Sequence, residues 1–293
     1  MAERPHHLLF SERLQRRARV WWGKPNKWRN RDSYRHLLHR LKENHSLLSE
    51  DDPEERWRCC ALWQRLLSNK WNARQFVQRH GFRVPALYWY GRRPGALPID
   101  ALPDHFVVRP IWGAATRGTY VFARDRDLLS GIPFSKASLK EHLVRTAGRF
   151  VRFPIMAEEF VKTESGRYEL PTEYKWYMFG DTVGAIQVVQ RSDRDEARNR
   201  FYTAGWEPFD DPINTHNAVA DYVDPPRGLG ELLTCAQTLG AAYGTFVRVD
   251  LYATDAGCVF GEFSSTPLEG RYFTPFAEHY FGELWQRTFP DRT

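Results

Sequence analysis

The stretch FVRVDLYATDAGCVFGEFSS, residues 246–265, predicts two strands joined by a tight turn. The first strand alternates apolar side chains with Arg248 and Asp250, so these two charged side chains share one face. A turn centred on Ala256 places Asp250 opposite Glu262, with Cβ atoms about 5 Å apart. Two opposed carboxylates repel each other, and a hard cation such as Mg²⁺ relieves that repulsion by taking oxygen ligands. The pair therefore indicates a metal site, although an exposed hairpin with its acids in water would show the same pattern.

The same register extends the predicted face by further residues. It sets Arg248 opposite Ser264, beside the two carboxylates. Strand alternation adds Phe260 to the face that holds Glu262 and Ser264. A cation, a hydroxyl and two acids would then lie together at one end of the hairpin.

Length and composition indicate a globular chain. It has 293 residues, of which 42% are hydrophobic, enough for one large domain or two modest ones. No apolar run approaches the roughly 20 residues that a membrane span needs, and the start, MAERPHHLLF, lacks the long apolar stretch of a signal peptide. The four cysteines show no paired metal-ligand spacing. We therefore expect a cytoplasmic protein in a reducing compartment.

The positive charge is concentrated in the first 50 residues. They contain 12 Lys and Arg and 5 Asp and Glu, a net charge of +7, whereas the whole chain carries +6. Three tryptophans, Trp21, Trp22 and Trp28, lie among the basic residues. Such a segment can bind an acidic glycan, another anionic polymer or an anionic membrane surface. It can equally be a solvated helical region whose tryptophans pack on the rest of the protein.

The remaining sequence predicts an α+β chain of mixed helices and strands. A helix is expected to begin at Asp52, because Pro53 suits the first helical position and Glu55 completes a capping pattern. The other expected helices are about residues 72–80, 138–148 and 229–243, with a closing helix in the aromatic tail 266–293. The expected strands are residues 82–91, 106–110, 119–123, 155–161, 173–180 and 182–191, and residues 192–224 are expected to be rich in loops.

Several stretches in this order carry a family resemblance: SNKWNARQFVQRHG, PDHFVVRP, EEFV, LPTEYKWYMFGD, VVQRSDR and FGEFSSTPLEG. Together they resemble the ATP-grasp superfamily, and within it the TupA-like branch associated with teichuronopeptide biosynthesis. The resemblance covers roughly residues 65–275. It implies an α+β ATP-grasp fold in which two lobes, expected at about 61–155 and 156–293, close over ATP. A basic helical region, 1–60, would precede them.

The resemblance also implies which side chains meet the phosphates of ATP. Lys70 and Arg109 are expected to contact them, and the loop from Gly113 to Gly118 to cover them. Family members usually carry lysine at the second of these positions. Arginine keeps the charge and adds a planar fork of donors. Because Arg109 lies in an apolar strand it needs an anionic partner, which could also be a structural carboxylate.

The rest of the nucleotide site follows from the same resemblance. Glu158, Glu159 and Val161 correspond to the hinge that holds adenine, largely through backbone groups. Strand alternation lets only one of the two glutamates point inward. Glu173 corresponds to the acid that binds the ribose hydroxyls, and Lys175 would lie near the phosphates.

For the metal and the reacting groups, the resemblance makes Asp250, Glu262 and Ser264 the ligands of Mg²⁺, with two ions expected. Many relatives carry asparagine where this chain has Ser264. Arg248 and Arg191 are expected to steady the transferring phosphoryl group or an acyl phosphate. From its position alone, Arg271 is expected to face the carboxylate of the substrate.

These expectations describe an ATP- and Mg²⁺-dependent carboxylate–amine ligase. Phosphorylating a carboxylate gives an acyl phosphate, from which an amine displaces phosphate. The expected partners are an amine or amino acid and a carboxylate. By the resemblance, the acceptor is a uronic acid of a cell-surface polysaccharide or its precursor, or another amino acid. The basic arm would suit an anionic glycan or a lipid-linked acceptor at the inner membrane surface, and no nucleic acid partner is expected. The alternatives are an ATP-grasp phosphotransferase acting on a hydroxyl and an inactive nucleotide- or glycan-binding module.

Overall fold

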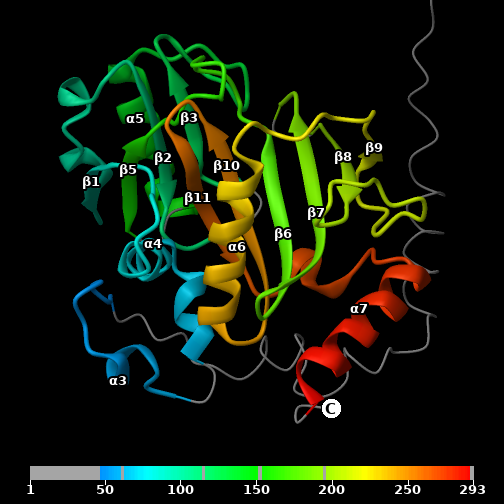
Figure 1. Ribbon diagram of the computed structural model, residues 1–293. Helices are drawn as coiled ribbons and strands as arrows, with labels where there is room; N and C mark the ends of the chain where they lie inside the picture. Colours follow the sequence, from blue (N-terminus) through cyan, green and yellow to red (C-terminus); the bar gives the residue numbers. More distant parts are fainter. Residues whose placement is uncertain (1–46, 61–62, 114–115, 151–153, 194–195, 291–293) are drawn as a thin grey trace, which may run out of the picture.

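The computed structural model describes residues 47–60, 63–113, 116–150, 154–193 and 196–290. Within these residues the strands form two sheets, one of five strands and one of six (Figure 1). None of the described helices combines the length and the apolar character needed to cross a bilayer. The expected basic helical region falls mostly in residues 1–46, which lie outside the described residues.

The first sheet is antiparallel, with strand order β1-β5-β2-β3-β4. The helix α5 (Lys136–Phe150) covers it, and Leu139 and Leu143 pack there against Phe106 and Val108. The strands are β1 (Leu87–Gly91), β2 (His105–Pro110), β3 (Tyr120–Ala123), β4 (Arg126–Asp127) and β5 (Ile155–Glu159), joined in part by the short 3-10 helices η3 (Pro94–Ala96) and η4 (Ile99–Ala101).

The second sheet has the order β11-β10-β6-β7-β8-β9. All its pairs are antiparallel except the short pair of β8 with β9. Its strands are β6 (Glu173–Phe179), β7 (Thr182–Arg191), β8 (Ala197–Tyr202), β9 (Ala218–Val219), β10 (Phe246–Thr254) and β11 (Gly257–Ser264).

The two faces of the second sheet are covered differently. On one face α6 (Leu229–Tyr243) packs across β10 and β6, burying residues such as Trp176 and Val249 (Figure 1). On the other face α7 (Pro275–Thr288) covers one end only, where Phe179 and Phe246 meet Phe281. Further along the same strands this second face becomes charged, and the candidate site lies there.

The helix α4 (Lys70–Arg79) begins and ends for local reasons. The side chain of Asn69 accepts a hydrogen bond from the backbone N–H of Trp71, which caps the first turn. Gly81 follows the helix with φ +78°, a conformation that glycine adopts without strain. The predicted helix at 72–80 is confirmed, and it starts two residues earlier than expected. This start puts Lys70 in the first turn.

One expectation about the helices was wrong. The helix expected from Asp52 is only four residues long, α3 (Glu54–Trp57), and buries Trp57 alone. The chain then continues as a separate 3-10 helix, η2 (Trp63–Ser68). The described residues of 192–224 lie mostly outside helices and strands, as expected, apart from β8 and β9.

The strand β5 is also placed differently from the expectation. We expected the second lobe to begin at residue 156, but β5 pairs with both β1 and β2 inside the first sheet. The chain passes from the first sheet to the second between Glu159 and Glu173.

Candidate functional site

The hairpin of β10 and β11 has the pairing that was predicted, for a different reason. Asp250 pairs with Glu262, and Arg248 with Ser264. The turn, however, is closed by Thr254 opposite Gly257 and is not symmetric about Ala256. One extra residue in β11 makes up the difference. Because Leu251 pairs with Phe260, the residue left over is a bulge at position 261.

Glycine at position 261 fits this bulge because there is no room for a side chain. A Cβ atom there would lie 3.1 Å from the carbonyl oxygen of Asp250 and 2.9 Å from the ring of Tyr252. The bulge also changes which way the neighbours face. Phe260 joins the apolar core beneath α6, so the expectation that it shares a face with Glu262 was wrong.

Asp250 is buried and held by two cations on its own face of the sheet. The guanidinium of Arg248 donates from Nε to Oδ1 at 2.6 Å and from Nη2 to Oδ2 at 2.7 Å. Lys175, directly opposite on β6, donates from Nζ to Oδ2 at 3.1 Å. Burial would lower the pKa of Lys175, but the charges of Asp250 and Glu173 raise it. Lys175 is therefore a cation fixed beside the acid pair.

Glu262 lies where the two sheets approach each other. Its Oε2 is 3.4 Å from Nζ of Lys70 in α4, and its Oε1 is 3.5 Å from Nη2 of Arg248. Burial would raise the pKa of Glu262, but the positive charges of Lys70, Arg248, Lys175 and Arg109 lower it to about 2. The carboxylate is thus ionised at neutral pH, while 37% of its side chain remains exposed.

Glu173 extends the same charged face towards β7. It forms an ion pair with Lys175, and its Oε1 is 3.2 Å from Nε of Arg191. Burial would raise the pKa of Glu173, but Lys175 and Arg191 lower it. The structure therefore brings the expected ribose acid and both neighbouring cations together.

We call this set of side chains the charged network. Its acids are Glu173, Asp250 and Glu262, and its cations are Lys70, Lys175, Arg191 and Arg248. Counted over these side chains, the network carries one net positive charge. Each acid is paired with two cations. An entering anion can therefore bind one of these cations while the acid keeps the other. The arrangement suits a polyanionic ligand that brings its own metal ion.

The first sheet contributes a second group of charges. Arg109 on β2 places Nε 2.6 Å from Oε1 of Glu158 on β5. Arg74, one turn after Lys70 in α4, places Nη1 3.5 Å from Oε2 of the same carboxylate. Of the two hinge glutamates Glu158 is the one that points inward, and its neighbour Glu159 instead contacts Arg83 at 2.8 Å. The partner that a buried Arg109 required is thus a carboxylate of the protein.

The start of α4 and the glycine loop after β2 lie side by side. The backbone N–H of Lys70 donates to the carbonyl of Ile111, and its Nζ donates to the carbonyl of Gly113 at 3.0 Å. Gly113 has φ +134° and Gly118 φ +70°, so both use conformations that favour glycine. Positions 114 and 115 of this loop lie outside the described residues.

Two expected site residues do not take part in these ion pairs. Val161 is buried two residues beyond the end of β5. Arg271 is exposed and follows the 3-10 helix η5 (Pro267–Gly270). The ion pairs described above therefore do not bear on its expected contact with a substrate carboxylate.

A match to the TupA-like ATPgrasp family covers residues 61–286, most of the chain. The chain belongs to this family. The expected family and ATP-grasp fold are thereby confirmed, and with them the general class of ATP-grasp enzymes. None of the curated proteins searched matches the sequence.

Several solved structures with low sequence identity are similar to this fold. A D-alanine–D-alanine ligase from Bacillus anthracis complexed with ATP is similar with TM-score 0.49 and 12% identity, over 78% of this chain and 66% of that one. The ATP-grasp ligase PsnB complexed with a minimal precursor gives 0.44 and 14%, over 76% and 61%. An L-amino acid ligase from Bacillus licheniformis gives 0.41 and 16%, over 68% and 40%. The chain thus spans less than two thirds of the length of each of these.

The acid pair of this TupA-like chain suits a magnesium site that is completed by ligands from outside the protein. Among the described residues no group of three or more His, Cys, Asp or Glu side chains is arranged to hold a metal ion. Asp250 and Glu262 are two opposed carboxylates, with the hydroxyl residue Ser264 beside them. Mg²⁺ is commonly held by one or two carboxylates together with water and substrate phosphates. The residues present therefore fit a magnesium ion that arrives with a nucleotide.

Sequence reasoning missed several polar residues of this face. The hydroxyl of Tyr177, opposite Arg248 on β6, donates to Oε1 of Gln187 at 3.1 Å, and Nε2 of Gln187 donates to Oδ1 of Asn199 at 2.9 Å. Alternation from Lys175 could have indicated Tyr177, and helical spacing from Lys70 could have indicated Arg74. No comparable signal pointed to Asn199, because β8 was not expected.

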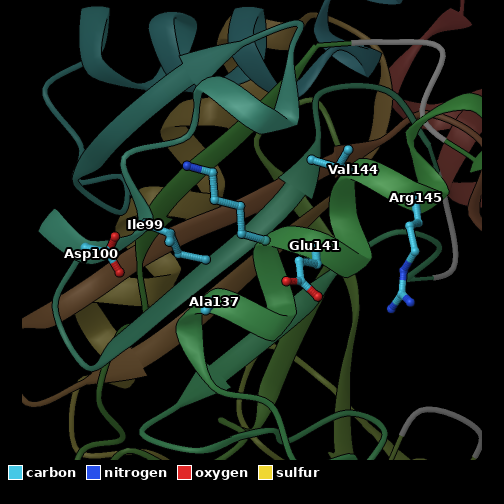
Figure 2. A pocket seen from close by; sticks show the side chains of 7 residues that line it. Ile99, Asp100, Ala137, Glu141, Val144 and Arg145 are labelled. Carbon is cyan, nitrogen blue, oxygen red and sulfur yellow. The ribbon is translucent and has the colours of Figure 1, made fainter.

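A hollow of about 540 Å³ lies elsewhere in the TupA-like chain, on η4 and α5. Figure 2 shows its acidic side chains Asp100 and Glu141 beside Ile99 and Val144. None of the expected site residues lines it. Its mixed charges single out no class of ligand.

Proposed function

We propose that this chain is an ATP- and Mg²⁺-dependent carboxylate–amine ligase that forms an amide bond through an acyl phosphate. The observation that carries the proposal is the charged network, in which the opposed carboxylates Asp250 and Glu262 lie among Lys70, Lys175 and Arg248. Phosphoryl transfer needs positioning and charge stabilisation more than it needs a protein nucleophile. The network supplies cations from both sheets around one acid pair.

In the proposed reaction a substrate carboxylate oxygen attacks the γ-phosphorus of ATP and ADP leaves. The amine then attacks the carbonyl carbon of the acyl phosphate, phosphate leaves, and the nitrogen loses a proton. Lys70, Arg109 and Lys175 hold the phosphates, and Arg248 with Arg191 stabilises the charge that develops on the transferring group. Magnesium held by Asp250, Glu262 and Ser264 would neutralise phosphate charge.

The remaining assignments complete the nucleotide site. Glu173 binds the ribose, and the backbone from Glu158 to Val161 holds adenine. The loop from Gly113 to Gly118 closes over the phosphates and excludes water, which would otherwise hydrolyse the acyl phosphate. Lys70 supports this role because its Nζ already contacts the carbonyl of Gly113.

For the substrates, we propose an amino acid joined to a uronic acid or to another amino acid, in cell-surface polysaccharide or peptide biosynthesis. Arg271 would face the substrate carboxylate. The basic arm at residues 1–50 would bind an anionic glycan or lipid-linked acceptor at the inner membrane surface. We also propose that two magnesium ions bind. Along the chain, the basic N-terminal region would be followed by two lobes that close over ATP. The TupA-like family membership supports the ATP-dependent step of this proposal.

The test is an ADP-release assay with panels of amino acids and uronic acids, supplied singly and in pairs. We expect ADP release and an amide product only when a carboxylate and an amine are both present with Mg²⁺. A stable phosphorylated product that forms without an amine would indicate a phosphotransferase. Absence of Mg·ATP binding in a direct titration would indicate an inactive module and would contradict the proposal.

A further inference from the structure

Glu158 is enclosed by two arginines that come from different elements. Arg109 reaches it from β2 and Arg74 from α4, and the side chains of Arg74 and Glu158 are 8% and 4% exposed. A carboxylate buried this deeply with two guanidinium groups is uncommon, because removing charges from water is costly unless they are paired. One acid neutralises only one of the two arginines. The group therefore keeps a positive charge.

The two arginines are held in different ways. Arg74 is anchored at Nη2, which donates to the carbonyl of Pro85 at 3.1 Å, while its Nη1 forms only an ion pair with Oε2 of Glu158 at 3.5 Å. Arg109 meets Glu158 through Nε, on the edge of the guanidinium nearest its own side chain. A guanidinium carries five N–H donors. Nη2 shares this edge with Nε, as in the contact of Arg248 with Asp250. Contact at Nε therefore leaves Nη1, on the opposite edge, directed away from Glu158.

The charge of Arg109 also interacts with groups of the second sheet. Burial would lower the pKa of Arg109, but Glu158, then Tyr252 and Glu262, raise it. Arg109 in turn is one of the positive charges that lower the pKa of Glu262. Arg109 thus forms an ion pair in the first sheet and also interacts electrostatically with Glu262 of the charged network.

We propose that Glu158 is a positioning residue: it holds Arg109 at Nε and leaves Nη1 to reach the triphosphate. Arg74 keeps Glu158 in place. The inference rests on the proposed function and adds a role for the Glu158 side chain that is distinct from adenine binding by the hinge backbone. It also accounts for arginine at position 109. A lysine has a single nitrogen, which the same carboxylate would occupy.

The test is a double-mutant cycle on nucleotide affinity with Glu158→Gln, Arg109→Lys and the double variant of the full chain. Dissociation constants for Mg·ATP come from calorimetric titration. Each single change is expected to weaken binding about tenfold, the loss of one charge-assisted contact. In the double variant, the lysine is released from the acid and can reach the phosphates. We therefore expect the double variant to bind no more weakly than the weaker single variant.

Independent losses would instead multiply to about a hundredfold in the double variant, which would overturn the proposal. The same titrations with ITP, which lacks the amino group of adenine, test the base. A positioning role leaves the ratio of ATP to ITP affinity unchanged in Glu158→Gln. A changed ratio would show that Glu158 contacts the base and would also overturn the proposal.

Two further measurements keep the test decisive. If Glu158→Gln does not fold, Glu158→Asp with Arg109→Met forms a second cycle in which a carboxylate is kept. Glu283→Gln, an exposed residue of α7 paired with His279, is the control and should combine additively with Arg109→Lys. A wild-type chain that binds no Mg·ATP would refute the proposed function itself, whereas an additive cycle in a chain that binds Mg·ATP refutes only the role of Glu158.

Discussion

The two sheets hold their buried acids in opposite ways. In the first sheet, Glu158 is closed in by Arg74 and Arg109 and is almost inaccessible to solvent. In the second, Asp250 and Glu262 share several cations on the face that α7 covers at one end. An enclosed acid has a single set of partners, and removing the acid leaves their buried charges uncompensated. An acid in a shared network can exchange partners. The first group therefore suits positioning, and the second suits ligand exchange.

Exposure separates the two acids of the metal pair as well. The side chain of Asp250 is 6% exposed, whereas that of Glu262 is 37% exposed. Asp250 is fixed by three contacts to Arg248 and Lys175, and Glu262 has two longer ones. Glu262 is therefore the acid whose chemistry can be removed with the least damage to the fold.

The largest expected effect comes from Glu262→Gln, which breaks the shared network at its exposed member. Removing a metal ligand forfeits several kcal/mol of transition-state stabilisation, so turnover should fall about 10³-fold. The unfolding free energy should change by less than about 1 kcal/mol, because the ion pairs lost are partly exposed. ADP release and urea denaturation measure the two quantities. The matched control is Ser264→Ala, which should lower turnover far less, since water can replace a neutral hydroxyl. Equal turnover in Glu262→Gln and the wild type would contradict the metal role.

The enclosed acid should behave in the reverse manner. Glu158→Ala leaves Arg74 and Arg109 buried without their carboxylate, which should lower the unfolding free energy by about 3–5 kcal/mol. Glu159→Ala is the neighbouring control. Glu159 pairs with Arg83, whose side chain is 37% exposed, so this change should cost no more than about 1 kcal/mol. Urea denaturation of both variants measures the difference. Similar costs at the two positions would remove the distinction between the enclosed glutamate and the partly exposed one.

How far the sequence predicts this arrangement depends on the range of the interaction. The facing of Arg248 and Asp250 follows from strand alternation, and it was predicted correctly. The helix α6 followed from its apolar spacing. The bulge at Gly261 was not predictable, because a register offset in one strand compensates for a shift in the turn and leaves the same pair opposed. The pairing of Asp250 with Glu262 was therefore predicted correctly from an incorrect position of the turn.

The long-range partners could not be predicted in the same way. That Arg109 needs an anion follows from its burial, but only the pairing of β5 with β2 identifies Glu158 as that anion. The strand β8 escaped notice because its polar sequence, ARNRFY, gains its strand conformation from pairing with β7. Tertiary pairing, which no local pattern records, decides both cases.

A smaller effect is expected at the bulge that supports the shared network. Gly261→Ala would place a Cβ atom against the carbonyl of Asp250 and the ring of Tyr252, which should cost about 1–3 kcal/mol of unfolding free energy. The control is Gly230→Ala in α6, where a Cβ atom meets nothing within 4 Å. There the change should stabilise the protein by up to about 1 kcal/mol, since alanine favours the helix. Thermal and urea denaturation of both variants give the signs. A neutral Gly261→Ala would mean that the hairpin relaxes without strain.

The smallest expected effect is a pH dependence of stability that comes from Glu262. The folded-state pKa of Glu262 is about 2, below the ordinary value of 4.5, because the surrounding cations outweigh burial. A carboxyl group with a lowered pKa stabilises the folded chain at pH values above its unfolded pKa. This contribution is lost as the pH falls from about 4.5 towards 2. The difference in unfolding free energy between the wild type and Glu262→Gln should therefore be constant near neutral pH and shrink below about pH 4.5. Added salt should reduce the difference, because the side chain is partly exposed. Urea denaturation at a series of pH values measures it, and a difference that stays constant down to pH 3 would show that the cations do not act on Glu262.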